Sequence, residues 1–374
     1  MKLRNVFVAA AAVSTLALTP VSGIAQVNAQ VGIAQDVVTP PAPENTIPVG
    51  TVSEEIQASE FEDDSWRNVV KEKGDRVQEV TVYSPSMDRK IPVVTIKADQ
   101  SAGPRPTLYL LNGAGGGEQS ANWIAQTDAL DFYLEKNINV VIPMRGAFSY
   151  YTDWNETPAD SKYLKGPQKW ETFLINELPG PIEKHLGANG KRGIAGMSMS
   201  GTSSLLLAAH NPGFYDATGS FSGCAETNSP MGRAAVGLTV NRAGAHPDQI
   251  WGPTGSKRSL ENDALLQAEF LRGTEIYVSN ATGLIGQRET LQGLREQGIP
   301  EQALSANQAN LAIAGGGIEA VTNACTHRFV AKLNHLGIPV DHHRPATGTH
   351  TWSYWQDDLR TSWPTFSRAF GIAE

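Results

Sequence analysis

The chain has 374 residues, of which 40% are hydrophobic and 18% charged, and its formal net charge is -8 at pH 7. This composition is typical of a soluble globular enzyme and does not fit a disordered or coiled-coil protein. The negative charge, without a stripe of Lys and Arg residues, argues against nucleic acid as a partner.

The N-terminus carries the pattern of a secretory signal peptide. Two basic residues precede an apolar run from Val6 to Leu18, and small residues follow at Ala25 and Ala29. Cleavage after either alanine fits the pattern, and the apolar run is too short for a comfortable membrane span. We therefore take residues 1–29 as a signal peptide and expect an exported protein that is not integral to a membrane.

Residues 30–65 are rich in Pro, Gln, Ala and acidic residues, which predicts a flexible extension. Residues 66–374 then alternate β-like and helical stretches. The expected strands span Val77–Tyr83, Ile91–Ile96, Thr107–Leu111, Ile138–Pro143, Arg192–Ala195, Thr218–Ser222, Glu275–Ser279 and Ile338–Arg344. The first two are separated by turn residues and predict an antiparallel hairpin.

Helical stretches lie between most of these strands. They span Asn122–Glu135, Trp170–His185, Thr202–His210, Glu319–Leu336 and Trp355–Phe370. Residues 225–270 are rich in Gly, Pro and Asn and suggest a long surface excursion, while residues 281–316 suggest an insertion. Alternating strands and helices predict a single α/β domain, with a mostly parallel central sheet that helices cover on both faces.

The most informative motif is Gly196-Met197-Ser198-Met199-Ser200-Gly201, which joins an expected strand to an expected helix. A serine on such a sharp turn exposes its hydroxyl to a substrate, and small neighbours allow the crowded backbone. Ser198 is therefore a candidate nucleophile. An ordinary glycine-rich connection between a strand and a helix is the alternative.

A nucleophilic serine needs a base, and His350 follows the last strand, where α/β-hydrolases carry it. The acid that orients this histidine is less clear. The loop after Glu275–Ser279 contains no carboxylate close to the strand. From the residues alone, Glu319 is favoured, and Glu289, Asp341 and Asp357 remain open.

Acyl transfer also needs two N–H groups that face the developing oxyanion. The backbone of Met199, next to the serine, and that of Ala114, in the Gly-rich loop after Thr107–Leu111, are the candidates. This loop lacks the lysine of a phosphate-binding loop. No residue cluster has metal-ligand spacing, so we expect neither a metal nor another cofactor.

Two cysteines, Cys224 and Cys325, remain after removal of the signal peptide. In an oxidising compartment an even pair favours a disulfide, although two separate buried thiols are the alternative.

Several sequence blocks, in the same order, resemble the secreted mycolyltransferases of mycolate-containing bacteria, an antigen-complex family within the esterase-like α/β-hydrolases. They run from about Val77 to the C-terminus and include Leu110–Gly113, Tyr150–Trp154, Lys169–Leu174, Glu177–Pro179, Gly196–Gly201, Ile250–Pro253 and Gly348–Trp355. The resemblance implies the α/β-hydrolase fold and a Ser-Glu-His triad. Its glutamate lies about thirty residues before the histidine, which selects Glu319, and its oxyanion donors fall on Ala114 and Met199.

The resemblance also implies an activity in the cell envelope, with peripheral association with the outer envelope. A mycolyl group would pass from trehalose monomycolate, through an acyl-serine, to a second trehalose monomycolate or to cell-wall arabinogalactan. Asn112, Trp154 and Trp352 are the candidate substrate contacts, with Trp123 as a further aromatic residue that could stack on a sugar.

Two departures from the family pattern concern the acceptor. Asn112 and a run of Ala and Gly stand where mycobacterial members carry an aspartate and an arginine that hold trehalose. The cysteine pair and residues 281–316 look more like the corynebacterial branch, which handles shorter corynomycolates and has members thought to acylate proteins. A secreted carboxylesterase, a protein O-mycolyltransferase and a non-catalytic binding protein are the alternative functions.

Overall fold

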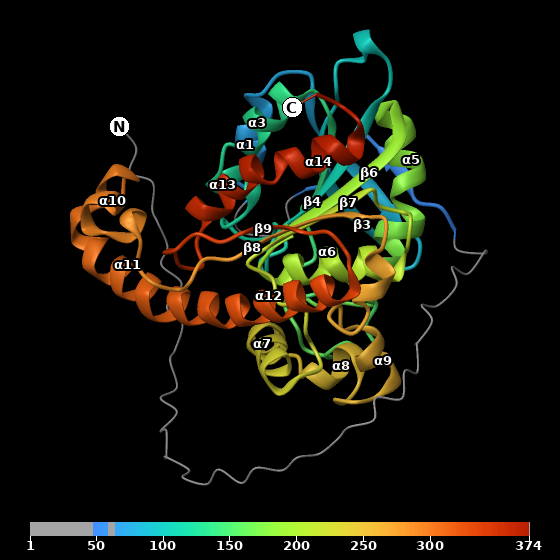
Figure 1. The fold of residues 1–374 in the computed structure, drawn as a ribbon. Coiled ribbons are helices and arrows are strands. Elements are labelled where there is room, and N and C mark those ends of the chain that lie inside the picture. Colours follow the sequence, from blue (N-terminus) through green and yellow to red (C-terminus); the bar gives the residue numbers. More distant parts are fainter. Residues whose placement is uncertain (1–47, 59–63, 374) are drawn as a thin grey trace, which may run out of the picture. The chain divides into compact units, whose positions relative to one another are not determined.

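A nine-stranded sheet forms the centre of the computed structural model, which describes residues 48–58 and 64–373 (Figure 1). The order across the sheet is β1-β2-β3-β5-β4-β6-β7-β8-β9. The strands are β1 (Thr51–Ser53), β2 (Val77–Ser84), β3 (Arg89–Ile96), β4 (Arg105–Leu111), β5 (Asn139–Pro143), β6 (Ala188–Met197), β7 (Ala217–Phe221), β8 (Glu275–Ser279) and β9 (Asp341–His343). The expected signal peptide lies outside the described residues.

The strand pairing confirms the mostly parallel sheet. β1, β2 and β3 pair antiparallel with their neighbours, and β3 is antiparallel to β5. All pairs from β5 through β4 to β9 are parallel. The eight expected strands are present, and the expected hairpin is β2–β3. β1 was not expected, because it is three residues long within the segment predicted to be an extension, too short to show alternation.

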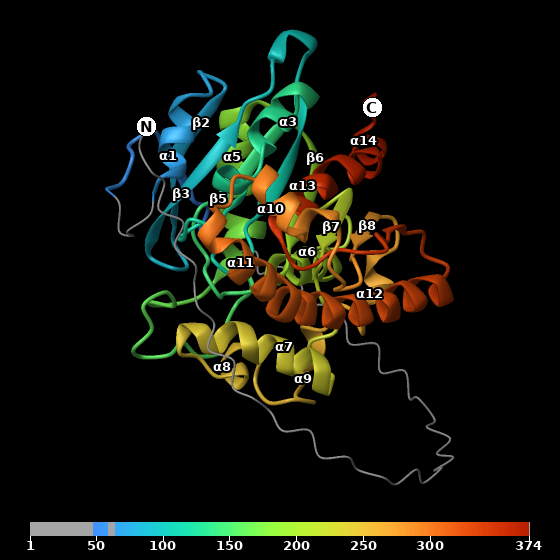
Figure 2. The same ribbon diagram turned by 90° about the vertical axis from the view of Figure 1, so that its left-hand side faces the viewer.

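The two faces of the sheet bury different sets of helices (Figures 1 and 2). Tyr109 and Leu111 of β4 pack in one core with α5 (Pro179–Leu186), α6 (Met199–His210) and α12 (Gly316–Leu336). Leu108 and Leu110, which alternate with them, pack in the other core. That second core contains residues of α1 (Trp66–Lys71), α2 (Trp123–Gln126), α3 (Ala129–Lys136), α13 (Trp352–Thr361) and α14 (Trp363–Phe370).

Three expected helices are divided in the structure. The stretch Asn122–Glu135 forms α2 and α3, and Trp170–His185 forms α4 (Trp170–Thr172), a π-helical segment (Phe173–Glu177) and α5. The last helix is divided into α13 and α14. Prolines occupy the first turns of α5 and α14, where a missing N–H is tolerated.

Residues 225–270 form a helical cap rather than the expected surface excursion. This cap contains α7 (Pro230–Val240), α8 (Pro247–Trp251) and α9 (Lys257–Glu261), which lie together in Figure 2. Ser229, His246 and Ser256 cap these helices. The helices are too short for a sequence period to reveal them. Residues 281–316 contain α10 (Leu291–Glu296), α11 (Leu304–Asn310) and the π-helical segment η7 (Leu311–Gly315), which continues into α12.

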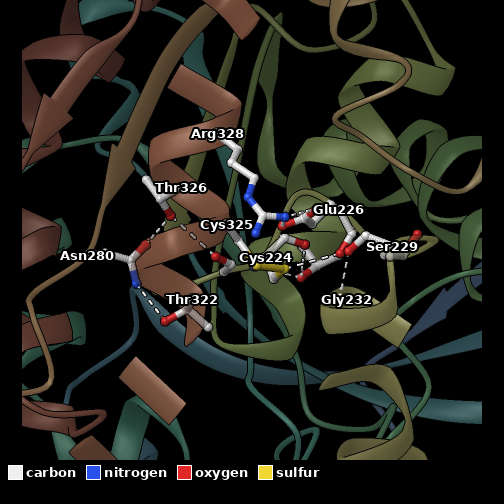
Figure 3. Close-up of a disulfide and its surroundings, with 12 residues drawn as sticks. Cys224, Glu226, Ser229, Gly232, Asn280, Thr322, Cys325, Thr326 and Arg328 are labelled. Atoms are coloured by element: carbon white, nitrogen blue, oxygen red, sulfur yellow. Dashed lines mark hydrogen bonds and ion pairs between the residues drawn. A yellow bond between two sulfur atoms is a disulfide. The ribbon is translucent and has the colours of Figure 1, made fainter. Parts of the chain in front are cut away.

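The expected disulfide is present. It joins Cys224, just after β7, to Cys325 on α12 across a separation of 101 residues (Figure 3). Close to it, the amide of Asn280 donates to Thr322 Oγ1 at 2.7 Å and Thr326 donates to the Asn280 carbonyl oxygen. α12 is thus tied to the ends of both β7 and β8. Within the described residues, no helix combines the length and apolar character needed to cross a membrane.

We predict that removing the disulfide with Cys224→Ala/Cys325→Ala lowers the free energy of unfolding by about 4 kcal/mol, because the unfolded chain loses a long closed loop. Ester turnover should fall as well, since α12 carries Glu319. Denaturant unfolding and ester hydrolysis measure the two effects. Unchanged turnover in the destabilised variant would show that the remaining contacts of α12 are sufficient to hold the site.

His210, the last residue of α6, should make the stability of the fold depend on pH. Its Nδ1 lies 2.9 Å from the Glu171 carboxylate and its Nε2 2.8 Å from the Glu261 carbonyl oxygen. Burial alone would lower the pKa of His210, but the Glu171 carboxylate raises it from 6.5 to about 9. A folded pKa above the unfolded value means that the protonated pair stabilises the fold below about pH 6.5 and loses this effect as pH rises through about 9.

The variant His210→Gln should therefore lose about 3 kcal/mol of stability relative to the natural chain at about pH 6, and almost none above about pH 9.5. Denaturant unfolding of both proteins across this range measures the difference. A difference that stays constant with pH would contradict the charged state assigned to His210.

Candidate active site

Ser198 lies on a strained turn between β6 and α6. Its φ is 57° and its ψ is -121°, a region that non-glycine residues rarely adopt, and its N–H donates to the Phe221 carbonyl oxygen at 2.8 Å. A Cβ at Gly196 would lie 2.4 Å from the Ser200 carbonyl oxygen, so only glycine fits there. The turn therefore has the geometry of a nucleophile elbow.

Ser200 contributes more than its small size. Its hydroxyl accepts from the Met197 N–H at 2.9 Å and lies 3.0 Å from the Leu111 carbonyl oxygen at the end of β4. This links the serine turn to the strand that leads into the Ala114 loop. A glycine at this position could not make the link.

The structure brings Ser198, His350 and Glu319 into a continuous hydrogen-bonded chain. His350 Nε2 lies 2.8 Å from Ser198 Oγ, and His350 Nδ1 lies 2.9 Å from Glu319 Oε2. Ser198 and His350 are half-buried, whereas Glu319 is 1% exposed. These distances suit proton transfer from the hydroxyl to an imidazole that a carboxylate orients.

The other candidate acids are engaged elsewhere. Asp341 contacts Thr365 and Arg368, and Asp357 pairs with Arg288 at 2.7 Å. Glu289, described below, bonds to the residue that precedes the histidine. Of the four candidates, Glu319 is the one in contact with the imidazole.

The second oxygen of Glu319 is held by three donors that the sequence did not reveal. Glu319 Oε1 accepts from the Ser222 hydroxyl at 2.9 Å, the Ala281 N–H at 2.8 Å and the Asn280 amide at 3.3 Å. The Ser222 hydroxyl in turn accepts from Trp355 Nε1 at 3.0 Å. Since Oε1 is occupied in this way, the carboxylate cannot rotate freely and Oε2 stays directed at His350.

Glu289 fixes the loop that carries the histidine. It is 1% exposed, and its Oε1 accepts from the N–H of Thr349 at 3.2 Å and from the Thr349 hydroxyl at 3.0 Å. Its Oε2 accepts from the Tyr354 hydroxyl at 2.9 Å and the Gly286 N–H at 2.8 Å. Glu289 therefore acts on the site through Thr349, one residue before His350.

The two candidate oxyanion donors lie on adjacent turns. Leu111 of β4 is paired in parallel with Gly196 of β6, so the loops after these strands emerge at the same edge of the sheet. Met199 is the first residue of α6, where an N–H has no acceptor within the helix. The N–H of Ala114 has no acceptor among the described residues, and its carbonyl oxygen accepts from the Phe148 N–H at 2.8 Å.

Glu118 supports this loop from behind. Its Oε1 accepts from the N–H groups of Gly146 and Ala147 at 2.9 and 3.1 Å, which holds the segment that bonds to Ala114. Burial raises the pKa of Glu118, although these two N–H groups partly offset the effect. No motif in the sequence had marked Glu118 as a candidate site residue.

The structure does not bring two of the three expected sugar contacts to a surface. Asn112 is fully buried; its amide donates to the Pro143 carbonyl oxygen at 3.1 Å and its oxygen accepts from the Trp123 N–H at 3.0 Å. Trp154 is buried and donates to the Ser149 carbonyl oxygen. Trp352 is half-buried, with its ring edge-on to those of Trp123 and Trp355.

A search of the described residues for metal-ligand groups finds one cluster, formed by Cys224, Glu226 and Cys325. The two sulfur atoms are bonded to each other, so they offer no thiolate to a metal.

A parallel sheet with a strand–serine–helix turn and a later histidine and acid in contact defines the α/β-hydrolase class. The comparisons agree: the family model named Esterase matches residues 84–366. Ag85A of Mycobacterium tuberculosis, a diacylglycerol acyltransferase/mycolyltransferase, is 31% identical over 299 residues, which cover 79% of this chain and 82% of that protein. Ag85B of Mycobacterium intracellulare is 30% identical over 82% of this chain and 87% of its own. The chain belongs to this mycolyltransferase family and is an enzyme of the acyltransferase type.

The crystal structure of Mycobacterium tuberculosis MPT51 (FbpC1) shows the same fold. It superposes with a TM-score of 0.62 at 23% identity and covers 79% of this chain and 100% of its own. The predicted α/β-hydrolase fold is thereby confirmed.

We predict that Glu319→Gln lowers kcat by about 10^3 to 10^4-fold, because the amide neither holds the neutral imidazole in the Nδ1–H tautomer nor stabilises the imidazolium that forms. Glu289→Gln should lower kcat by about 10 to 100-fold, because the loop shifts while the triad stays complete. Hydrolysis of an activated ester, with circular dichroism to verify folding, measures both. Glu301→Gln, on an exposed side chain of the same segment, is the control. A larger loss from Glu289→Gln than from Glu319→Gln would contradict these roles.

Proposed function

We propose that this enzyme transfers a mycolyl or corynomycolyl group from trehalose monomycolate to a second trehalose monomycolate or to cell-wall arabinogalactan. The observation that carries the proposal is the unbroken chain of contacts from Ser198 through His350 to Glu319, in a chain of the mycolyltransferase family. Its place of action would be the cell envelope, after export directed by residues 1–29.

In the first half-reaction Ser198 Oγ attacks the ester carbonyl of the donor while His350 takes its proton. Glu319 stabilises the imidazolium, and the N–H groups of Ala114 and Met199 bind the oxyanion. The tetrahedral intermediate collapses, trehalose leaves with the proton from His350, and an acyl-serine remains. In the second half-reaction an acceptor hydroxyl gives its proton to His350 and attacks the acyl-serine; the intermediate collapses, and Ser198 leaves with the proton from His350.

Exposed aliphatic side chains are concentrated in the segment that contacts the histidine loop, and they support a hydrocarbon substrate. The described residues include nine exposed large aliphatic side chains, and five of them lie within residues 284–318: Leu284, Ile285, Leu291, Ile313 and Ile318. This segment contacts the loop directly, since the N–H of Gly348 donates to the Leu284 carbonyl oxygen and that of His350 to the Gly315 carbonyl oxygen. Hydrocarbon covering these side chains would remove apolar surface from water.

The test is incubation of the purified enzyme with trehalose monoesters of different chain lengths, followed by mass analysis of the products. We expect a trehalose diester and free trehalose, and loss of both when Ser198→Ala lowers kcat by roughly 10^4 to 10^6-fold. Ser101→Ala, at an exposed serine before β4, is the matched control and should behave like the natural enzyme.

The products also separate the alternative functions. Free fatty acid as the sole acyl product, even at high acceptor concentration, would replace the transferase with a carboxylesterase. Acyl transfer from the same donor to added envelope proteins, without a diester, would indicate a protein O-mycolyltransferase. Unchanged turnover in Ser198→Ala would exclude the proposed nucleophile.

A further inference from the structure

A small cavity with an accessible volume of ≈ 30 Å³ lies behind the candidate triad acid. Its lining includes Glu319 and Ser222, which belong to the site described above, together with Ser279, His343, Asp357 and Asp358. A cavity of this size has room for a water molecule. Glu319 and Asp358 thus line the same small, partly open cavity, although they lie on different helices.

Asp358, on α13, is 5% exposed and takes no part in the proposed chemistry. Its Oδ1 accepts from the Tyr277 hydroxyl at 2.9 Å, and that hydroxyl also lies 2.6 Å from Thr361 Oγ1. Burial raises the pKa of Tyr277, which therefore remains a donor. Ser279 is also buried, and its hydroxyl lies beside both Asp358 and Tyr277, where it lowers the pKa of each.

No lysine or arginine lines this cavity. On α13, Asp357 is directed to Arg288 and Tyr354 to Glu289. β8 presents Tyr277, β9 presents His343, and α12 presents Glu319, whose carboxylate has four donors including His350. A charge on Asp358 would face the charge of Glu319 with two hydroxyl groups, those of Tyr277 and Ser279, and no strong cation beside it. Burial, helped by Glu319 and Asp357, accordingly raises the pKa of Asp358 from 3.8 to about 8.

We propose that Asp358 is a positioning residue, which keeps its proton in the working enzyme and so leaves Glu319 without a second, unpaired negative charge beside it in the cavity. This inference rests on the proposed role of Glu319. When Asp358 loses its proton, the two carboxylates repel each other across the cavity. This repulsion acts against the three donors that hold Glu319 Oε1 and weakens the contact between Glu319 Oε2 and His350 Nδ1, because His350 lies on a loop.

The direction of the pH effect follows from the charge. Asp358 is neutral below about pH 8 and ionised above it. At about pH 9 roughly one tenth of the molecules still carry the proton, so kcat should fall by about tenfold between pH 7 and pH 9. Asp358→Asn is neutral at every pH and has nearly the same shape, so its kcat at pH 7 should lie within about twofold of the natural enzyme and stay level to about pH 9.

The experiment measures kcat for hydrolysis of a short-chain p-nitrophenyl ester between about pH 6 and pH 10 in the natural enzyme, Asp358→Asn and Asp357→Asn. The last variant removes the neighbouring, solvent-facing carboxylate and should keep the alkaline decline. Persistence of the decline in Asp358→Asn would overturn the inference, as would a folded Asp358→Asn enzyme that is inactive at all pH values. Because ester hydrolysis needs no sugar acceptor, failure of the transferase assay would leave this test intact.

Infrared spectroscopy of the natural enzyme provides a measurement that does not depend on the variant folding. A buried carboxylic acid band should be present at about pH 7 and disappear through about pH 8. Its absence at pH 7 would overturn the proposal. The free energy of unfolding should also fall with rising pH. A carboxyl whose pKa is raised in the folded state makes the fold less stable as pH rises from about 4 through about 8.

Discussion

The contact between Glu319 Oε2 and His350 Nδ1 is the interaction on which the site depends, because it joins two segments that the sheet alone does not hold together. The serine is fixed by β6 and α6, inside the core. The histidine lies on a loop and the acid on a helix that begins outside the sheet. The two carboxylate oxygens of Glu319 have different partners. Oε1 accepts hydrogen bonds from Ser222, Ala281 and Asn280, and Oε2 is therefore available to the imidazole.

The position of α12 is therefore a constraint on the chemistry, and it is set by close backbone packing as well as by the disulfide. A Cβ at Gly283 would lie 2.4 Å from the Gly316 carbonyl oxygen, and a Cβ at Gly316 would lie 2.6 Å from the Gly283 carbonyl oxygen. Glycines that suggest flexibility in the sequence allow two backbones to touch here. The segment expected to be an insertion also contributes the Ala281 N–H, the Glu289 carboxylate and the Gly315 carbonyl oxygen to the site.

The residues that sequence reasoning could place are those whose position follows from local pattern and chain order. Ser198 has its strand, turn and helix beside it, and His350 follows the last strand. Glu319 was favoured from the residues alone, but three other acids stayed open because the strand that precedes it is followed by a long insertion, and the family resemblance then selected Glu319. The sequence did not reveal the contact of Ser222 with Glu319 or that of Glu289 with Thr349, since these partners lie 97 and 60 residues apart; Glu289 was expected only as a candidate for the acid itself. Asn112 was wrongly expected to contact a sugar. Its motif pointed to the family, but nothing in the sequence indicated that its side chain is buried.

The buried carboxyl groups around the site can be ordered by the number of donors each one receives. Glu319 and Glu289 have four donors each, which can replace the water that an ionised carboxylate loses on burial. Glu118 has two backbone donors on one oxygen and none on the other, and burial raises its pKa. Asp358 has the hydroxyls of Tyr277 and Ser279 beside it, and burial raises its pKa to about 8. The supply of N–H and O–H groups therefore differs between the buried acids around the site, and burial favours the protonated form where this supply is small. For a site built on one oriented imidazole, that distribution matters as much as the distances within the triad.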